Sequence, residues 1–429
     1  MIPDIEYASQ TEIKTFQVDA LKILLGYLNT HSVFYKRLFR THQIDVKNIN
    51  TLEDLAAIPT TTKDDLQLYN DDFMCVPKNK IIDYVTTSGT LGEPVIFGLT
   101  DNDLERLAYN EAISFACAGI GQDDVIQLMT TMDRRFMAGL AYFLGARKLG
   151  AGIIRVGNGI PELQWDSILK FKPTYIIAVP SFLLKLIEYA KQHNIDPNAS
   201  GIKAAICIGE PLRHQDFSLN TLSEKIKEDW NIELFSTYAS TEMNTAFTEC
   251  TQQQGGHQHP ELIITEILDD NNLPVPEGEA GELTITTLGL EGMPLLRFKT
   301  GDIVKAHNAP CDCGRNTTRL GPVIGRKKQM IKYKGTTIYP PAMHNVLNDF
   351  NEVESYVIEL SHNSIGTDEI LIKIATAEPT DVLLQNIKNH FRAKLRVLPK
   401  IEFCNKKDIQ KLQFPKMSRK PVMVIDKRE

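Results

Sequence analysis

Residues 204–242 read AAICIGEPLRHQDFSLNTLSEKIKEDWNIELFSTYASTE and contain the unit from which the fold is built. Residues 204–208 and 232–236 are short apolar runs that predict buried strands, and residues 220–230 have the apolar spacing of an amphipathic helix. A strand, a helix and a second strand in this order form a right-handed unit with parallel strands. The stretch therefore predicts an α/β fold.

The same alternation precedes this stretch. Strands are predicted at 125–130, 152–156 and 175–179, and helices at 136–149, 165–171 and 181–193. Repeated units of this kind place helices on the two faces of one sheet, so we expect a parallel sheet that is covered on both sides.

The flanking segments have other patterns. Residues 10–75 read as helices joined by short polar turns, with apolar residues at helical spacing over 16–39. Polar residues near 54 and at 60–64 suit helix starts. Residues 262–304 change to short strands and Gly/Pro turns, which predict a smaller β-rich subdomain.

The last hundred residues predict a separate, small α+β unit. Strands are expected at 353–360, 369–375 and 400–404, and an amphipathic helix at 380–395. The polar stretch 325–329 suits a linker or hinge. We therefore expect a large N-terminal domain over 1–325 and a small, mobile C-terminal domain over 326–429.

Composition sets the class of protein. A chain of 429 residues has room for two or three domains, and 42% hydrophobic with 24% charged residues is ordinary for a globular protein. The net charge of −7 provides no basic field for nucleic acid or an anionic membrane. Neither a secretory signal nor an apolar run of bilayer length is evident. We expect a cytoplasmic protein without nucleic-acid or membrane partners.

Residues 84–94 concentrate hydroxyls and glycines after an apolar entry. Glycines allow the backbone to approach a ligand closely, and consecutive N–H groups with hydroxyls form a concave anion site. A polar hairpin turn explains the same composition and is the commoner outcome. No Gly-Lys-Ser/Thr follows, so this is not a Walker A loop.

Residues 87–94 (TSGTLGEP) resemble the phosphate loop of the adenylate-forming superfamily, which includes acyl–CoA ligases, luciferases and peptide-synthetase adenylation domains. Leu91 stands where the usual loop has a second Thr. Val95 stands where a Lys is frequent, a departure that is common among phenylacetate–CoA ligases. The resemblance implies that the nucleotide phosphates bind at Thr87, Ser88, Gly89 and Thr90.

Further segments follow in that superfamily's order. Residues 207–211 (CIGEP) resemble the Gly-Gly-Glu-Pro turn beside adenine, and residues 238–242 (YASTE) resemble Tyr-Gly-x-Thr-Glu. The second motif follows a predicted strand, where α/β sheets bind ligands and a carboxylate can hold Mg²⁺. Without the resemblance, a helix cap is the simpler interpretation of this motif. The implied nucleotide contacts are Gly209, Glu210, Pro211, Tyr238 and Thr241, with Glu242 as the magnesium ligand.

Residues 297–302 (RFKTGD) resemble Arg-Tyr-Arg-Thr-Gly-Asp, with Lys299 for the second Arg. A carboxylate offers two acceptor oxygens to a vicinal diol, so Asp302 is expected at the ribose, although a turn Asp is the plainer alternative. Residues 325–340 resemble the family's hinge and the loop after it. The resemblance implies that Arg326 meets the ribose, Lys328 is the hinge residue, and Gly335 lines the coenzyme A tunnel.

Two segments concern the acid and its activation. Residues 418–428 (SRKPVMVIDKR) resemble the closing motif of phenylacetate–CoA ligases, which implies that Lys420 is the adenylation lysine. A point charge on a flexible stem suits charge that develops in a transition state, although charged tails are usually solvated. Residues 134–140 (RRFMAGL) resemble acyl-pocket sequence. The implied pocket residues are Phe136, Ala138 and Gly139.

The chain has seven cysteines, an odd and sparse set that does not predict disulfides. Cys311 and Cys313 form a C-x-C pair, and Cys250 and His257 lie upstream. Together they offer a Cys₃His set, which is typical of structural zinc. His259 is a rival for the fourth position, and the resemblance favours His257 because relatives share the Cys-x₆-His spacing. Buried reduced cysteines with a surface His are the alternative.

The resemblance covers nearly the whole chain, which is identified as a member of the phenylacetate–CoA ligase family. It implies ATP-dependent ligation of an aryl or other carboxylic acid to coenzyme A through an acyl-adenylate, with release of AMP and pyrophosphate. ATP, Mg²⁺, coenzyme A and structural Zn²⁺ are the implied cofactors, and a homodimer is a family-based expectation. The alternatives are another acid or acceptor, or a non-catalytic nucleotide-binding zinc protein. The last one is suggested by departures at Leu91, Ile208, Lys299 and Arg419.

Overall fold

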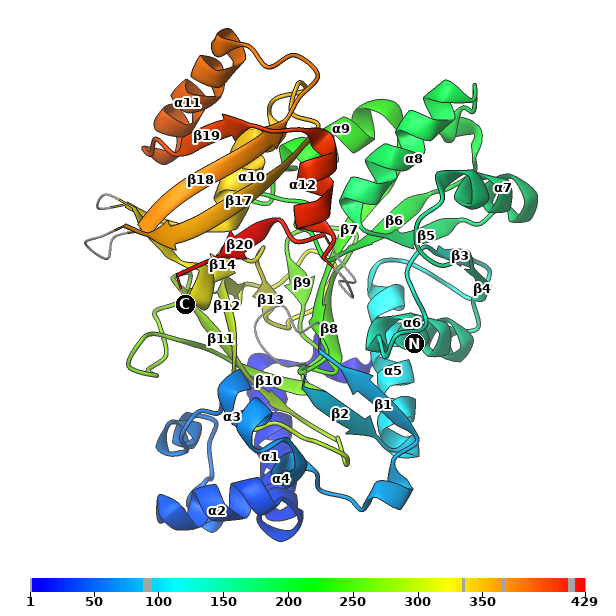
Figure 1. Cartoon of the computed structure of the whole chain (residues 1–429). Helices are drawn as coiled ribbons and strands as arrows, with labels where there is room; N and C mark the ends of the chain where they lie inside the picture. Colours follow the sequence, from blue (N-terminus) through cyan, green and yellow to red (C-terminus); the bar gives the residue numbers. More distant parts are fainter. Residues whose placement is uncertain (1, 88–94, 334–335, 364–367, 416–420, 429) are drawn as a thin grey trace. The chain divides into compact units, whose positions relative to one another are not determined.

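The computed structural model describes residues 2–87, 95–333, 336–363, 368–415 and 421–428. The chain divides into two compact units (Figure 1). The first comprises Met1–Leu219, Ser223–Thr300 and Val304–Pro322, and the second comprises Asn220–Leu222, Gly301–Ile303 and Val323–Glu429. The predicted boundary between residues 325 and 326 remains a prediction.

The first unit contains the predicted parallel sheet. Its parallel strands are β3 (Val125–Leu128), β4 (Gly152–Arg155), β5 (Tyr175–Ala178), β6 (Ala204–Ile208) and β7 (Glu233–Ser240). They lie in the order β4-β3-β5-β6-β7. Every residue of β5 and β6 is buried, as expected for parallel strands that are covered on both faces.

Four helices connect these strands: α6 (Met137–Leu149), α7 (Pro161–Phe171), α8 (Pro180–Gln192) and α9 (Thr221–Asp229). The chain runs from β3 outward to β4 and then crosses to β5, on the other side of β3. Because such connections are right-handed, α6 lies on one face of the sheet and α7 and α8 on the other (Figure 1). The reversal of direction creates a switch point at the carboxyl ends of β3 and β5, where α/β sheets bind ligands.

The sheet continues beyond β7 with antiparallel strands. In spatial order they are β8 (Thr245–Glu249), β9 (Gly256–His257), β13 (Arg319–Leu320), β12 (Phe298–His307), β11 (Ala280–Thr287) and β10 (Ile263–Leu268). The short strands predicted over 262–304 therefore exist, and they share continuous hydrogen bonding with the parallel strands. Strand β7 extends to Ser240, beyond the predicted residue 236, because its last residues also pair with β8.

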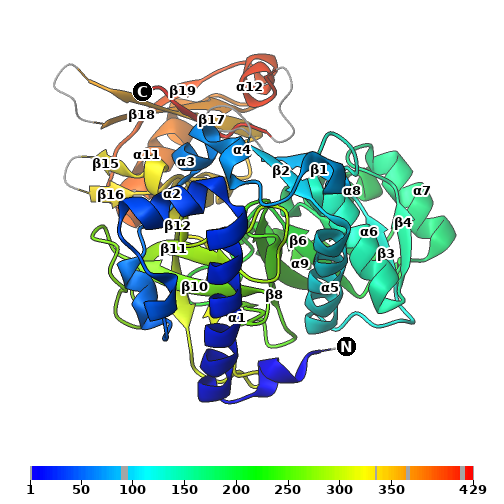
Figure 2. The ribbon, with the colours of Figure 1, turned by 90° about the horizontal axis from the view of Figure 1, so that it is seen from below.

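The N-terminal helices are α1 (Gln10–His31), α2 (Val33–Thr41), α3 (Lys63–Leu68) and α4 (Asn70–Phe73). The helical stretch predicted over 16–39 is interrupted at Ser32, whose hydroxyl accepts a hydrogen bond from Tyr35 N and caps α2. Thr62 and Asp65 form a capping box that begins α3, within the predicted start at 60–64. Helix α1 lies along the antiparallel strands (Figure 2), where the Gln17 amide donates to the carbonyls of Pro260 and Ile263.

A hairpin of β1 (Asp83–Thr86) and β2 (Ile96–Leu99) precedes α5 (Asp101–Cys117). Helices α5 and α6 pack against each other at Gly145, where a Cβ atom would lie 2.3 Å from Glu111 Cβ. Among the described residues, no helix is both long and apolar enough to cross a bilayer.

The second unit is α+β, as predicted. Its elements are β14 (Gly325–Arg326), β15 (Ile331–Tyr333), β16 (Thr336–Ile338), α10 (Pro340–Asn348), β17 (Ser355–His362), β18 (Asp368–Ala375), α11 (Asp381–Leu395), β19 (Lys400–Phe403), α12 (Lys406–Gln413) and β20 (Val424–Asp426). A four-stranded sheet has the order β19-β18-β17-β20. Leu383, Ile387 and Phe391 of α11 belong to the same apolar core as the buried residues of this sheet. Helix α12 and strand β20 were not predicted.

Gly145→Ala should destabilise the first unit by about 1–3 kcal/mol, because the new methyl would overlap Glu111 in a closely packed helix pair. Urea unfolding measures the change. Gly26→Ala is the matched control, since Gly26 lies in α1 with no atom within 4 Å of the new Cβ. This control should gain about 0.5–1 kcal/mol from helix propensity. A Gly145→Ala variant as stable as the wild type would contradict the close packing.

Candidate functional site

Strands β5, β6 and β7 end at one edge of the sheet. Ala178 pairs with Cys207, and Ile208 pairs with Thr237, so the residues that follow each strand lie side by side. These residues are Val179–Ser181 after β5, Gly209–Pro211 after β6 and Tyr238–Glu242 at the end of β7. The structure thus brings together at this edge the predicted nucleotide contacts Gly209, Glu210, Pro211, Tyr238, Thr241 and Glu242.

The turn after β6 is fixed by Gly209 and Glu210. Gly209 has a φ of 79°, a left-handed conformation that favours glycine. Glu210 Oε2 accepts from Ser181 N at 2.8 Å and Oε1 accepts from Ser181 Oγ at 2.9 Å, at the N-terminus of α8. A carboxylate there is stabilised by the helix dipole. Glu210 therefore anchors the turn to α8, and its predicted nucleotide contact remains a prediction.

The Tyr238–Glu242 motif forms a hairpin turn and not a helix cap. Ser240 of β7 pairs with Thr245 of β8, and the chain reverses over residues 241–244. Within the turn, Asn244 Nδ2 donates to Thr241 O at 3.0 Å, and Asn244 adopts a φ of 49°. Thr241 and Glu242 are both half-buried. The turn therefore places Thr241 and Glu242 at the carboxyl edge of the parallel strands.

Helix α5 holds this turn from the side of β8. Strand β9 pairs only with Thr248 and Glu249, so the first half of β8 needs other partners. Asn110 Oδ1 accepts from Ala246 N at 3.0 Å, and Arg106 Nη1 donates to Asn244 O at 2.7 Å. Side chains of α5 thus take the place of a neighbouring strand.

Arg106 and Asn110 are positioning residues that the sequence analysis missed. Arg106 also donates to the carbonyls of Leu262 and Leu288, both at 2.6 Å. Burial lowers the pKa of its guanidinium to about 10, so the group stays charged at neutral pH. Residues 106, 110 and 114 are polar and spaced by four, so they lie on one face of the helix, but residues 101–103, 105 and 111 are polar too, and the spacing alone did not single out Arg106 and Asn110.

The predicted phosphate loop connects the two strands of the β1–β2 hairpin. Thr87 N donates to Val95 O at 3.0 Å, and Thr87 Oγ1 accepts from Val95 N at 3.1 Å. Thr87 therefore closes the base of the loop. The other predicted phosphate ligands, Ser88, Gly89 and Thr90, lie outside the described residues.

The predicted acyl-pocket segment adjoins this hairpin, since Thr86 N donates to Arg135 O at 3.1 Å. Phe136 and Ala138 are half-buried at the start of α6. A Cβ atom at Gly139 would lie 2.1 Å from Thr131 O, so this glycine is required for close packing of α6 against the segment after β3.

In the second unit, Asp302 and Arg326 face each other. They are register partners of β12 and β14, and Asp302 Oδ1 accepts from Arg326 Nε at 3.2 Å. The structure thus brings the two predicted ribose contacts together. Lys328 lies in a 3₁₀ turn, and its carbonyl accepts from Arg428 Nη2 at 3.3 Å. Gly335 and Lys420 lie outside the described residues.

Four predicted metal ligands also meet in the first unit. The ligand atoms of Cys250, His257, Cys311 and Cys313 all lie within 4.8 Å of one another. Cys250 Sγ is 3.7 Å from Cys311 Sγ, and Cys313 Sγ is 3.5 Å from His257 Nε2. A tetrahedral Zn²⁺ with bonds of about 2.3 Å separates two sulfurs by about 3.8 Å. The four residues therefore fit a tetrahedral ion in donor chemistry and in spacing.

The outer contacts of this cluster orient its ligands. Thr317 Oγ1 lies 2.8 Å from His257 Nδ1, which leaves Nε2 directed at the cluster. Burial raises the pKa of the Cys313 thiol, but hydrogen bonds from His257 and Arg315 lower it by more. The net result is a pKa of about 5, below the usual value for a thiol. His257 is fully buried, so the alternative of a surface histidine is wrong.

His259 has a different role from His257. Its Nδ1 lies 2.6 Å from Glu6 Oε1, and its Nε2 lies 3.0 Å from Ser114 Oγ. Both ring nitrogens are therefore engaged away from the thiols. Among the described residues, His257 lies with the three cysteines and His259 does not.

Comparison with protein families shows the class to which this chain belongs. Residues 35–291 match the AMP-binding enzyme family, and residues 335–428 match the AMP-binding enzyme C-terminal domain. Since the first match covers more than half of the chain, the chain belongs to the AMP-binding enzyme family. The predicted superfamily is confirmed.

The relatives give a finer placement. The chain is 30% identical to a phenylacetate-coenzyme A ligase of Thermus thermophilus over 88% of this chain and 84% of the relative. It is 25% identical to a phenylacetate-coenzyme A ligase of Aromatoleum evansii over 99% and 96%. A solved 2-hydroxyisobutyryl-CoA ligase in complex with 2-HIB-AMP and CoA is 26% identical, with a TM-score of 0.72 over 100% of this chain and 92% of that chain. The predicted resemblance to phenylacetate–CoA ligases is confirmed.

Glu111→Gln should alter the pH dependence of stability. Burial raises the pKa of Glu111 from 4.5 to about 8, and a hydrogen bond from Asn110 offsets part of this. The folded protein keeps the proton while the unfolded chain releases it near pH 4.5. The contribution of protonated Glu111 to the free energy of unfolding of the wild type is therefore lost progressively as the pH rises from about 4.5 to 8. The variant should become more stable than the wild type by an increasing margin over this range.

Urea unfolding of both proteins at several pH values measures this margin. Parallel stability curves for wild type and Glu111→Gln would show that Glu111 is ionised in the folded protein.

Proposed function

We propose that this chain is an AMP-forming ligase that joins a carboxylic acid, of the aryl type exemplified by phenylacetate, to coenzyme A. The observation that carries the proposal is the convergence of Gly209–Pro211 and Tyr238–Glu242 at one carboxyl edge of the sheet, in the order expected of the family. The phenylacetate-coenzyme A ligases among its relatives support the acid and the acceptor.

In the first half-reaction, the substrate carboxylate attacks the α-phosphorus of ATP and pyrophosphate leaves. Thr241 and the loop of Thr87, Ser88, Gly89 and Thr90 donate hydrogen bonds to the phosphate oxygens. Lys420 balances the charge that develops between the carboxylate and the α-phosphate. Glu242 would hold Mg²⁺, which neutralises the oxygens of ATP. Asp302 accepts hydrogen bonds from the ribose hydroxyls beside Arg326.

In the second half-reaction, the thiol of coenzyme A attacks the acyl carbon and AMP leaves. We infer that the second unit turns about Lys328 between the two steps, so that the Gly335 loop lines the coenzyme A tunnel and Lys420 withdraws. Rotation of a small domain about a few residues is a general way to build two sites from one pair of domains.

We further propose that Cys250, His257, Cys311 and Cys313 hold a structural Zn²⁺. Three thiolates and a neutral imidazole form a closed tetrahedral set with no position for a reactant. The Glu249–Cys250 end of β8 and the loop that carries Cys311 and Cys313 are joined by such an ion. We also propose that the protein is cytoplasmic, in keeping with its reduced thiols. The proposal that it is a homodimer is based on the family.

The first test is release of AMP from ATP in the presence of coenzyme A and a panel of acids. Phenylacetate and other aryl acids should give AMP and the thioester, and short fatty acids should be poorer substrates. The similarity to 2-hydroxyisobutyryl-CoA ligase makes hydroxy acids a necessary part of the panel. No AMP with any acid would refute the ligase.

In the same assay, Lys420→Ala should slow adenylation by about 10²–10³-fold, the usual effect of losing one group that stabilises transition-state charge. Lys411→Ala is the control, because Lys411 is an exposed residue of α12 that pairs with Asp408. Equal rates for both variants would contradict the role of Lys420.

The Cys311→Ser/Cys313→Ser double variant should lose its zinc and unfold more easily, by more than about 4 kcal/mol, because a structural metal is among the largest single contributions to stability. Metal analysis by mass spectrometry and urea unfolding measure both effects. Cys404→Ser is the control, since Cys404 belongs to the second unit and is not one of the four cluster residues. Zinc retained at full stoichiometry in the double variant would exclude the cluster as its site.

A further inference from the structure

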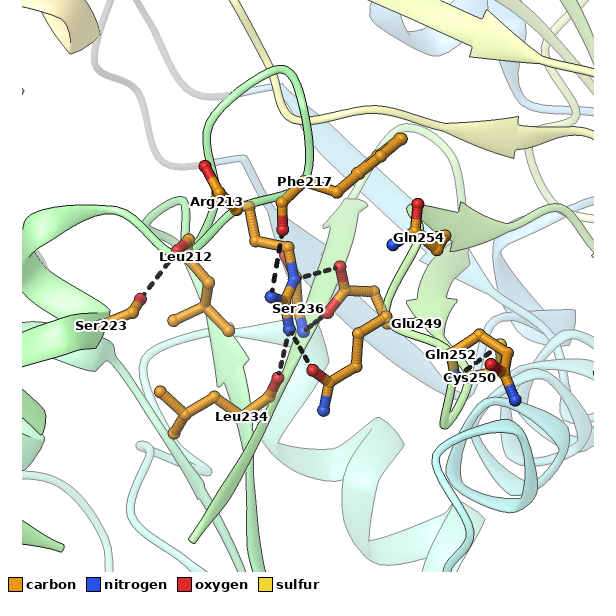
Figure 3. Close-up of polar contacts among 12 residues, drawn as sticks. Leu212, Arg213, Phe217, Ser223, Leu234, Ser236, Glu249, Cys250, Gln252 and Gln254 are labelled. Atoms are coloured by element: carbon orange, nitrogen blue, oxygen red, sulfur yellow. Dashed lines mark hydrogen bonds and ion pairs between the residues drawn. The ribbon is translucent and has the colours of Figure 1, made fainter. Parts of the chain in front are cut away.

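A buried ion pair joins Arg213, in the segment that follows the Gly209–Pro211 turn, to Glu249 of β8 (Figure 3). Arg213 Nε is 2.9 Å from Glu249 Oε1, and the two side chains are only 5% and 3% exposed. A buried pair of this kind adds little net stability, because desolvation of two charges offsets their attraction. The contacts of the pair point to a role other than stability.

The remaining donors of Arg213 reach three different segments (Figure 3). Nη1 donates to Phe217 O at 3.3 Å in its own loop, and Nη2 donates to Leu234 O of β7 at 3.0 Å. Nη2 also donates to Gln253 Oε1 at 2.9 Å, in the loop between the metal ligands Cys250 and His257. One planar guanidinium thus fixes the distances among these three segments.

Glu249 repeats the connection from the other side. Its Oε2 accepts from Ser236 N of β7 at 2.8 Å, while its Oε1 accepts from Arg213. A third contact secures the backbone between the turn and the pair, since Ser223 Oγ of α9 donates to Leu212 O at 2.8 Å. Arg213 and Glu249 are therefore held by hydrogen bonds to β7, to the loop at Phe217 and to the loop that follows Cys250.

Arg213, Glu249 and Ser236 each lie within two residues of a motif or a candidate metal ligand. Arg213 follows Pro211 by two residues, Ser236 precedes Tyr238 by two, and Glu249 directly precedes Cys250. The pair consequently ties the turn after β6 to the end of β7 and to the thiol cluster. A displacement of either charge would move the turn relative to Tyr238.

We propose that Arg213 and Glu249 are positioning residues that hold the Gly209–Pro211 turn in place for the nucleotide, so that affinity for ATP depends on this pair. The inference rests on the proposed function, in which ATP binds at this turn. The turn contacts the nucleotide equally in the ground state and in the transition state. Loss of its position therefore raises KM for ATP and leaves kcat and KM for coenzyme A largely unchanged.

The test uses the full-length chain with Arg213→Lys, Glu249→Gln and the double variant Arg213→Met/Glu249→Leu. Removing one charge leaves the other uncompensated and can prevent folding, whereas removing both permits an apolar replacement that folds. KM for ATP, KM for coenzyme A and kcat are measured for each folded variant. We expect KM for ATP to rise tenfold or more. Lysine should not rescue it, because one ammonium cannot serve acceptors in three segments.

Leu25→Ala is the control for lost stability, since Leu25 is a fully buried residue of α1 that has no part in the turn. A rise in KM for ATP in the double variant, with none in Leu25→Ala, supports the inference. An unchanged KM for ATP in the folded double variant, or the same rise in both proteins, overturns it. Failure of the proposed function itself has a different signature, because the wild type would then form neither AMP nor a thioester with any acid of the panel.

Discussion

Strand β7 forms parallel hydrogen bonds with β6 on one side and antiparallel ones with β8 on the other. This double pairing requires the chain to reverse directly after Ser240, so the Thr241–Glu242 turn has to lie at the carboxyl edge beside the turn after β6. On the other side of β8, strand β9 reaches Thr248 and Glu249, and α5 supplies hydrogen bonds to Asn244 and Ala246 through Arg106 and Asn110. The arrangement of the candidate nucleotide site follows from these requirements.

Buried arginines are the common means by which this protein fixes irregular backbone. Arg106 binds carbonyls of three separate segments, Arg213 joins two strands and a loop, and Arg297 forms a two-point ion pair with Glu266. A planar guanidinium has five donors in a fixed geometry, which a lysine does not offer. Each of these arginines lies beside a motif. Arg106 bonds to the turn that carries Thr241 and Glu242, Arg213 follows the Gly209–Pro211 turn, and Arg297 begins the motif at 297–302.

The sequence was a good guide wherever the determining contacts are local. Predicted residues 204–208 coincide with β6, and the Cys/His motif led to four residues whose ligand atoms the structure groups together. The sequence could not predict that β7 extends to Ser240, because the extension depends on pairing with β8. The sequence also left open whether His257 or His259 lies with the cysteines. His259 forms hydrogen bonds with Glu6 and Ser114, and these tertiary contacts have no local signal in the sequence. Arg213 and Glu249 had no local signal, because their partners come from distant parts of the chain.

The contacts of Glu6 have a consequence for biosynthesis. This residue near the N-terminus binds His259, 253 residues later, and Arg315, 309 residues later, and Arg315 in turn donates to Cys313. At ribosomal rates of about 5–20 residues per second, the N-terminal segment is exposed for roughly 15–60 s before Arg315 has been made. Glu6 therefore reaches its full set of partners only after Arg315 has been synthesised. During that interval, Glu6 and the start of α1 are accessible to chaperones on the nascent chain.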